Sequence, residues 1–314
     1  MTDTHLHVLK ALLFPQQAVT AFAILEGASM PDLPQTLYSF RPEHRCLYRG
    51  ELEPDMAEVA PYLVILDRDA PFTDWLLLNG WGRNWGIFGV SRADIAVLNR
   101  HFRRHVRVAL GDRTVYFRYY SPHVMRNYLP SCDADQLRTI FGPVLMYLTE
   151  DEDPQFADLF WLQQDNLRQR VLPLRDPRPV SPDYLHSVSA RDEATAKGGR
   201  LLQRAEQSKK VGESIYVERM SSYLYECFPE TKQVPRDEMG RTILELTDRA
   251  AGYKLILETH VAPFIVAAWL FGRTFDEDFK AAKEVLEDYE MDTGMKAQWL
   301  WNFIEATVDD LPEE

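Results

Sequence analysis

Four prolines fall within ten residues, from Pro173 to Pro182 (PLRDPRPVSP), and this segment constrains the fold more than any other part of the chain. Proline fixes φ and lacks an amide donor, so the segment cannot continue a helix or a central strand. One hydrophobic core rarely fills a chain of 314 residues. We therefore predict a first domain over residues 1–172, a proline-rich linker over 173–190 and a second domain over 191–314.

The first domain alternates short apolar runs with helical patterns, which predicts a mixed α/β domain with a small sheet. Strands are expected at four places: Val19–Leu25, Tyr62–Leu66, Trp85–Val90 and Val144–Leu148. Helices are expected over Asp74–Leu78, after an N-cap at Ser91, after Ser121-Pro122 as far as Leu129, and over Asp133–Phe141. A hairpin is expected between Val106–Leu110 and Thr114–Tyr119.

The second domain has a helical pattern throughout, so the fold class is α+β followed by an all-α domain. Helices are predicted over residues 191–210, 213–228, 235–252, 254–271, 275–290 and 293–307. The stretch Leu255–Phe271 is apolar around most of its circumference, which indicates a central helix of the bundle. As an alternative, one side of it, including Phe264 and Trp269, lines a groove for an apolar segment of a partner. The acidic stretch Asp276–Asp292 indicates a solvated face or, as a second possibility, a contact for a basic partner.

The composition is that of a soluble globular protein, with 46% hydrophobic and 26% charged residues. The net charge is −13, and residues 191–314 hold 25 acids against 16 bases, so a nucleic-acid partner is not expected. No apolar run reaches the roughly 20 residues that cross a bilayer, and the N-terminus lacks the pattern of an export signal. We expect a cytoplasmic protein without stable membrane insertion, in which Cys46, Cys132 and Cys227 are reduced and buried.

Several segments contain residue types found in catalytic or ligand-binding sites, but each lacks a residue or a spacing that such a site requires. The loop GWGRNWG (Gly80 to Gly86) has neither the Lys-Ser/Thr of a P-loop nor the spacing of a dinucleotide site. His101 and His105 lie four residues apart in HFRRH, but no third metal ligand follows at a recognisable spacing. The basic residues around them, Arg100 to Arg107, suggest an anion-binding face or a solvated helix face. No GxSxG elbow is present.

The strongest candidates for binding a partner are Arg and Tyr residues in the first domain. Arg83 lies between Trp81 and Trp85 and is expected to stack on an aromatic ring or to pair with a carboxylate, and Trp85 is a candidate as well. On the predicted strand Arg118 and Tyr120 share a face, which we expect to be exposed above the next helix. Arg126 completes this polar cluster, and internal hydrogen bonding is the alternative role. Together with Phe264 and Trp269 these residues are the predicted partner-binding set.

With these residues given, the chain resembles the Tap/Tec-type (VasW-like) adaptor chaperones of bacterial type VI secretion. The resemblance rests on AFAILEGA (21–28), RCLYRGEL (45–52), EVAPYLVIL (58–66), WGRNWGIF (81–88), SRADIAVLNRHFRRHVRV (91–108) and FRYYSPHVMRNYLPSCDADQLRTIFGPV (117–144), and more loosely on FPE (228–230) and LFGRTF (270–275). Ser121 departs from the Asp that the family usually has in its FRYYDP pattern. If that position pairs with an arginine in relatives, the pair is in doubt here.

The resemblance implies a non-enzymatic cytoplasmic adaptor that binds a cognate secreted effector and helps load it onto the VgrG/PAAR spike. We accordingly expect no catalytic residue, no metal and no cofactor. The alternative hypothesis is a hydrolase that uses the carboxylates near Asp67 and Asp151.

Overall fold

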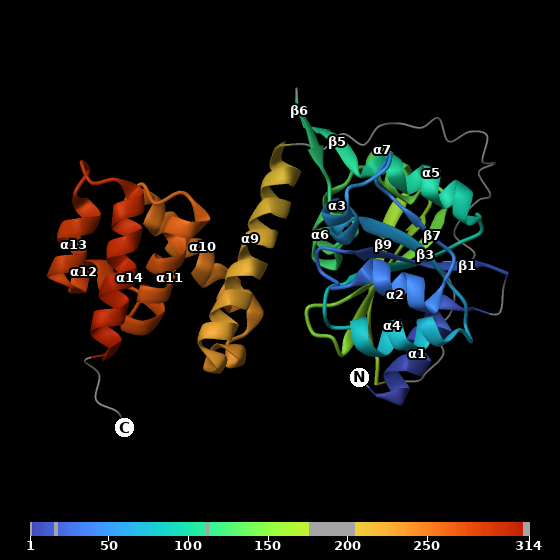
Figure 1. Ribbon diagram of the computed structural model, residues 1–314, viewed down its shortest axis with the longest axis horizontal. Helices are drawn as coiled ribbons and strands as arrows, with labels where there is room; N and C mark the ends of the chain where they lie inside the picture. Colours follow the sequence, from blue (N-terminus) through green and yellow to red (C-terminus); the bar gives the residue numbers. More distant parts are fainter. Residues whose placement is uncertain (1, 16–17, 111–112, 176–204, 310–314) are drawn as a thin grey trace. The chain divides into compact units, whose positions relative to one another are not determined.

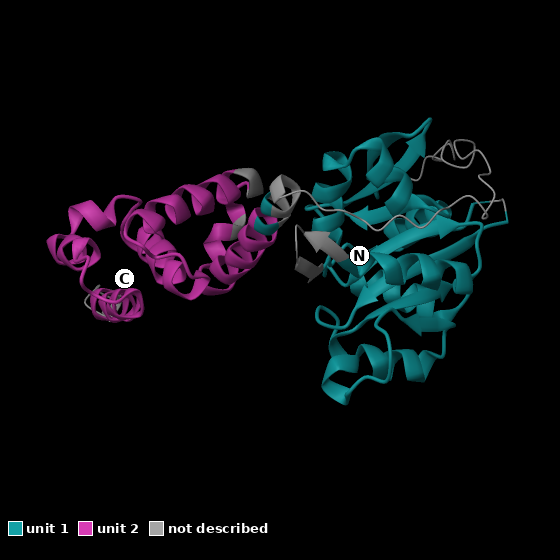
Figure 2. Cartoon of the chain, turned by 90° about the horizontal axis from the view of Figure 1, so that it is seen from above, with its two compact units in different colours: residues 1–212 teal, residues 213–314 magenta. Residues whose placement is uncertain are grey.

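The computed structural model describes residues 2–15, 18–110, 113–175 and 205–309. The chain divides into two compact units, residues 1–212 and residues 213–314 (Figure 2). Most of the predicted linker 173–190 and most of the predicted helix 191–210 lie outside the described residues. The predicted fold class is confirmed, with a sheet in the N-terminal half and helices in the C-terminal region.

The first unit is built on a seven-stranded sheet in which every neighbouring pair is antiparallel, in the order β2-β3-β1-β4-β7-β8-β9 (Figure 1). Its strands are β1 Thr20–Glu26, β2 His44–Cys46, β3 Pro61–Leu66, β4 Gly86–Ser91, β7 Val144–Glu150, β8 Phe156–Gln163 and β9 Asn166–Pro173. A separate hairpin pairs β5 (Arg107–Leu110) with β6 (Arg113–Tyr116). The four strands expected from sequence are thus present, and the sheet is larger than the small one predicted.

Helices cover both faces of this sheet (Figure 1). One face packs against α1 Asp3–Leu13, α2 Leu33–Phe40 and α4 Pro71–Gly80. The other face packs against α5 Ile95–His105, α6 Pro122–Tyr128 and α7 Ala134–Phe141, and the rings of Phe22 and Phe102 lie 5.2 Å apart there. The short α3 (Pro54–Val59) and the 3₁₀ turn η1 (Leu129–Ser131) complete the unit. Because both faces are covered, every residue of β4 and β7 is buried, which explains their uninterrupted apolar sequences.

Two local predictions in this unit are wrong. Ser91 is the last residue of β4, and Asp94 is the N-cap of α5, where its carboxylate accepts a hydrogen bond of 2.8 Å from the Val97 amide. The Ser91 hydroxyl instead donates to the Pro143 carbonyl. Strand β6 ends at Tyr116, so residues 117–120 lie outside it; Phe117 and Tyr119 are buried and Arg118 is exposed, as the predicted alternation requires, but Tyr120 is buried.

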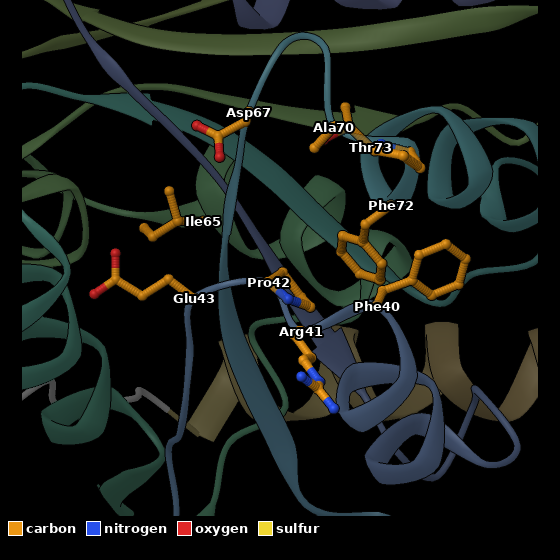
Figure 3. A pocket seen from close by; sticks show the side chains of 10 residues that line it. Phe40, Arg41, Pro42, Glu43, Ile65, Asp67, Ala70, Phe72 and Thr73 are labelled. Carbon is orange, nitrogen blue, oxygen red and sulfur yellow. The ribbon is translucent and has the colours of Figure 1, made fainter.

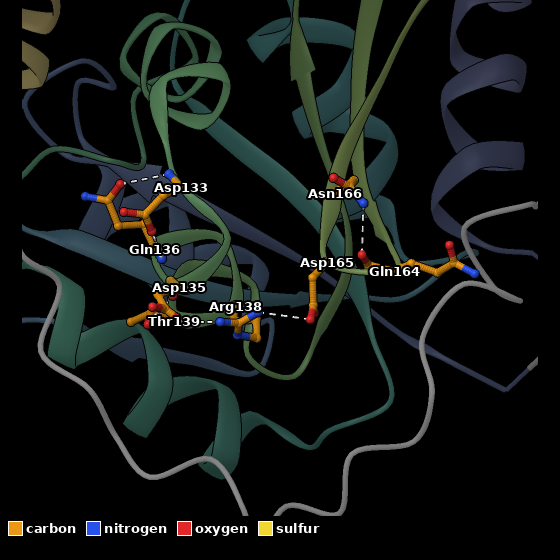
Figure 4. A network of polar contacts seen from close by, with 8 residues as sticks. All are labelled: Asp133, Asp135, Gln136, Arg138, Thr139, Gln164, Asp165 and Asn166. Carbon is orange, nitrogen blue, oxygen red and sulfur yellow. Dashed lines mark hydrogen bonds and ion pairs between the residues drawn. The ribbon is translucent and has the colours of Figure 1, made fainter.

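Helix α7 confirms the prediction of a helix after Asp133. The Asp133 and Gln136 side chains form a reciprocal capping box with each other's backbone amides. Arg138, on the same helix, pairs with Asp135 and, at 2.9 Å, with Asp165 in the β8–β9 turn (Figure 4). The helix is therefore tied to the edge hairpin β8–β9 as well as to β7, the strand that follows it.

The second unit is helical. Its elements are the end of α9 (Ala205–Cys227), η2 Pro229–Gln233, α10 Arg236–Gly252, α11 Glu258–Phe271, α12 Phe275–Asp278, α13 Lys280–Glu287 and α14 Thr293–Asp309. Helix α11 packs against α10, α12 and α14, as expected for a central helix. The predicted helix 275–290 is divided at Phe279, whose extended backbone ends α12 and begins α13. Within the described part of the chain, no helix is both long enough and apolar enough to span a membrane.

The ends of the C-terminal elements also differ from prediction. Helix α9 runs without interruption through Gly212, which has open space around it, although a break was expected near this residue. Asp276, in the stretch expected to be solvated, is fully buried. All three cysteines are free, but Cys227 is exposed and Cys46 and Cys132 are half-buried, so the expectation of burial is wrong.

Candidate functional site

The strand register brings the predicted Arg and Tyr residues of the first unit to one end of the sheet. β1 finishes at Glu26 opposite Pro61, the start of β3, and Leu25 pairs with Gly86, the start of β4. β7, antiparallel to β4, finishes at Glu150 on the same side. We call this the Glu26 end of the sheet. It is the part of the unit where a buried acid ends each of two strands.

Glu26 is held by the guanidinium of Arg118. Its side chain is only 2% exposed, and its two oxygens accept hydrogen bonds of 2.5 and 2.7 Å from Arg118 Nε and Nη2. The Ser29 hydroxyl donates a third bond of 2.8 Å. A buried carboxylate needs such partners because it has lost its hydration, and the two-pronged guanidinium supplies them in a fixed geometry. The Arg118 side chain remains 48% exposed, so this pair joins the core to the surface.

Two tyrosines, Tyr120 and Tyr48, are linked to each other by their hydroxyls near this ion pair. Tyr120 is buried and its hydroxyl bonds to that of Tyr48, so the expectation that Tyr120 lies on an exposed face is wrong. Burial is the main cause that raises the pKa of both phenols. Tyr48 contacts the exposed Tyr116 with ring centroids 5.7 Å apart, and Arg107 lies 5.0 Å above the Tyr116 ring. Arg118, Tyr116 and Arg107 thus give this end an outer surface of the residue types that interfaces favour.

The glycine-rich loop encloses a carboxylate of the chain itself. The backbone amides of Gly82 and Asn84, both at positive φ, donate to the two oxygens of the buried Glu150. Trp81 Nε1 donates to the Pro154 carbonyl at 2.9 Å, which fixes the loop against the turn after β7. The amides that resemble an anion-binding site in sequence are therefore engaged internally.

The remaining predicted residues of this end have structural contacts as well. Arg83 is exposed and its guanidinium lies 5.5 Å from the Trp85 ring, as the stacking prediction expected. Trp85 in turn packs on Trp75, with centroids 5.8 Å apart. Arg126 donates to the backbone carbonyl of Glu150. Sequence reasoning selected these residues but missed Glu26, Glu150, Tyr48 and Tyr116. The sequence pattern that could have identified Glu26 is an acidic residue directly at the end of an apolar strand.

The two carboxylates of the hydrolase hypothesis lie at opposite ends of the sheet. Asp67 follows the end of β3, which pairs with the start of β1, whereas Asp151 follows the end of β7. Near Asp151, burial raises the pKa of Asp158 to about 6, and a hydrogen bond with Asp151 adds to this rise. The Gln169 amide, which donates to Asp158 at 2.9 Å, acts in the other direction. Asp67 and Asp151 therefore do not share a site, and a hydrolase that uses the carboxylates near either of them stays a prediction.

A small cavity of about 190 Å³ lies beside Asp67 (Figure 3). The rings of Phe40 and Phe72, with centroids 5.6 Å apart, form part of its wall, and Arg41 and Glu43 add charges of opposite sign. The buried Thr73 hydroxyl at this cavity has no hydrogen-bond partner among the described residues. The cavity is at the end of the sheet remote from Glu26, so it is separate from the Arg and Tyr cluster.

His101 and His105 are core residues. Their ring centroids lie 4.6 Å apart, and the His101 Nε2 bonds to the Ile140 carbonyl at 2.9 Å. Burial lowers the pKa of His101 to about 4 and that of His105 still more clearly, so both rings are neutral near pH 7. Among the described residues, no group of three or more His, Cys, Asp or Glu side chains is arranged to hold a metal ion.

The last two predicted residues lie on α11 in the helical unit. Phe264 is fully buried and packs on Phe275 with centroids 5.0 Å apart. Trp269 is half-buried against the same core. The role of either residue in binding a partner stays a prediction, and the burial of Phe264 favours packing.

The fold and site define a two-unit protein whose first unit is an antiparallel sheet between helices, with an Arg and Tyr cluster at one sheet end. Residues 21–139 match the model of a family described as a domain of unknown function (DUF4123). The match begins in β1 and ends in α7, so it includes Glu26, Arg118 and Arg126. No curated protein and no solved structure is detectably similar to the chain.

Proposed function

We propose that this protein is a non-catalytic, cytoplasmic adaptor that binds a cognate effector of a type VI secretion system and helps load it onto the VgrG/PAAR spike. The observation that supports it is the DUF4123 match over residues 21–139, because this family is generally associated with effector adaptors of that system. The matched residues contain Glu26, Arg118 and Arg126 of the Glu26 end of the sheet, and Glu150 lies beyond them.

The chemistry of that end favours binding over catalysis. Glu26 and Glu150 are engaged by Arg118 and by loop amides, so neither is poised as a general acid or base. The exposed Arg118, Tyr116 and Arg107 offer planar, hydrogen-bonding side chains, which are the types most often found in binding hot spots.

The test is affinity purification of the full chain from an actively secreting strain, followed by identification of the retained proteins. The expected result is recovery of one effector encoded with the system, together with loss of that effector from the secreted fraction when the gene is deleted. Recovery of neither an effector nor a spike protein, with unchanged effector secretion in the deletion strain, would overturn the proposal.

A further inference from the structure

The negative charge of the protein is concentrated in the helical unit. Residues 213–314 hold 22 acidic and 10 basic residues, a net charge of −12, whereas residues 1–212 hold 26 and 25. All but one unit of the net negative charge of the protein therefore lies in the helical unit, which is about a third of the chain. Such a unit attracts basic partners at a distance and repels acidic ones.

The same unit displays large apolar side chains at one of its ends. Ile256 is 78% exposed and Leu257 is 61% exposed, in the loop between α10 and α11. Tyr289, in the loop between α13 and α14, is 65% exposed, and Met295 at the start of α14 is 62% exposed. We call these four residues the apolar patch.

Two cation–π contacts bring these segments together. The ammonium of Lys254, two residues before Ile256, lies 5.0 Å from the Tyr289 ring, and that of Lys296, directly after Met295, lies 5.8 Å from it. Lys296 is itself buried and donates to the Leu286 carbonyl at 2.6 Å, which fixes the start of α14 against α13. The loop before α11 and the loop before α14 therefore meet at Tyr289.

The apolar side chains are held on a defined loop. Lys254, shortly after the end of α10, lies in the left-handed region at φ +66°. The Leu255 amide donates back to the Ala250 carbonyl of α10 at 3.1 Å. Leu255 is buried, so the chain is fixed directly before Ile256. Leu257 then occupies the N-cap of α11, where a polar side chain would bond to the helix amides. Leucine is disfavoured at an N-cap because it cannot accept this hydrogen bond, and Leu257 is not buried in compensation. Residues that are unfavourable for local structure in this way are expected at functional sites.

Four acids flank Tyr289 at the end of α13 and in the loop between α13 and α14, and the ammoniums of Lys254 and Lys296 lie at its ring. Glu287, Asp288, Glu290 and Asp292 are exposed on both sides of Tyr289. Asp288 and Asp292 accept hydrogen bonds from backbone amides of their own loop, whereas Glu287 makes a long ion pair of 4.0 Å with the exposed Lys283 of its own helix. Apolar side chains inside an acidic rim are complementary to apolar side chains flanked by lysine or arginine.

We propose that the apolar patch is the docking surface for a segment of a protein partner that carries two or three large apolar side chains flanked by Lys or Arg. This proposal rests on the proposed adaptor function insofar as that partner is the effector. The apolar side chains supply affinity, and the acidic rim sets orientation and discriminates against acidic segments.

The first test uses the full chain and a labelled synthetic amphipathic peptide made of Leu and Lys, with a Leu/Glu peptide of the same pattern as the comparison. The Leu/Lys peptide should bind, and the variant Ile256→Ser/Leu257→Ser should weaken it at least tenfold. The matched control Tyr38→Ser/Met56→Ser removes two exposed apolar side chains from the first unit and should change the affinity less than twofold.

The rim is tested in the same assay by Glu287→Gln/Glu290→Gln. This change should weaken Leu/Lys binding severalfold and flatten its salt dependence, while Glu245→Gln, an exposed acid on α10, should not. Equal Leu/Lys affinity of the wild type and the Ile256→Ser/Leu257→Ser variant would overturn the proposal. So would a change in self-association of that variant in sedimentation with no change in peptide affinity, because the patch would then be an interface between copies of this chain.

A second arm separates this proposal from the adaptor function. If the wild type retains no effector in affinity purification from a secreting strain, this result counts against the adaptor function. The peptide assay then decides by itself whether the apolar patch is a docking surface. Retention of an effector by the wild type and equally by the Ile256→Ser/Leu257→Ser variant overturns the patch as its docking site.

Discussion

The two units handle their charged and apolar side chains in opposite ways. At the Glu26 end of the sheet, acids are buried and each is held by donors of the same unit, as in Glu26 with Arg118. In the helical unit most acids are exposed, and Ile256 and Leu257 are exposed with them. The buried, paired acids of the first unit stabilise its fold. The exposed apolar side chains of the helical unit remain in contact with water, and a partner that covers them would gain free energy of binding. The comparison therefore separates residues whose loss unfolds the protein from residues whose loss changes only binding.

The largest expected effect is at the Glu26–Arg118 pair. Arg118→Met leaves the buried Glu26 carboxylate without its guanidinium and should lower the free energy of unfolding by about 3 kcal/mol. Urea denaturation followed by circular dichroism measures this. The double variant Glu26→Gln/Arg118→Met should recover most of the loss, whereas Arg83→Ala, which removes only an exposed cation–π contact, should cost less than about 1 kcal/mol. A similar cost for Arg118→Met and Arg83→Ala would contradict a structural role of the pair.

The buried histidine predicts how the stability of the first unit depends on pH. The pKa of His101 is about 4 when folded against 6.5 for the free side chain, so the unfolded chain binds more protons between these values. The stability due to neutral His101 is complete above pH 6.5 and is lost as the pH falls toward 4, by about 3 kcal/mol in total. Denaturant titrations at several pH values measure the slope. His101→Gln should reduce it, and the slope that remains should come in part from His105.

Glu150 should give an intermediate effect. Glu150→Gln replaces one of the two oxygens that accept from the Gly82 and Asn84 amides by an NH₂ group, so one buried amide loses its acceptor. We expect a loss of about 2 kcal/mol in the free energy of unfolding. Faster hydrogen exchange at the amides of Gly82 and Asn84 would accompany it. Unchanged exchange at both amides would show that Glu150 does not hold the loop.

The smallest effect should have the opposite sign. Leu257→Ser places a capping hydroxyl at the start of α11 and should stabilise the helical unit by about 0.5–1 kcal/mol, while it weakens peptide binding at the apolar patch. Thermal unfolding of the full chain reports the first effect and peptide titration the second. A variant that is both less stable and equally competent in binding would show that Leu257 serves the fold.

Much of the fold was predictable where the local pattern is strong. β1, β3, β4 and β7 were expected within one or two residues because strands buried on both faces are apolar throughout. β9 (NLRQRVLP) escaped prediction because an edge strand with an exposed face keeps polar residues. The division of 275–290 at Phe279 was also missed, since its local sequence favours a continuous helix.

The candidate site was predictable only in part. Arg118, Arg83 and Arg126 were selected from residue type and context, and the structure places all three at one end of the sheet. Glu26, the partner of Arg118, lies 92 residues earlier in the chain, and no local pattern connects the two. Tyr120 was expected on the surface because its strand was extended too far, and the turn after Tyr116 buries it.

The sequence by itself determined the strands buried on both faces, the cap at Asp133, the division between a strand-containing half and a helical half, and the excess of acids in the helical half. These properties depend on residues close together in the chain, whose propensities and periodicity act locally. Only the tertiary structure decided that Glu26 pairs with Arg118, that the glycine-rich loop binds Glu150, and that Lys254 and Tyr289 meet in the helical unit. Such pairings follow from sheet register and helix packing, which join residues that the sequence keeps far apart.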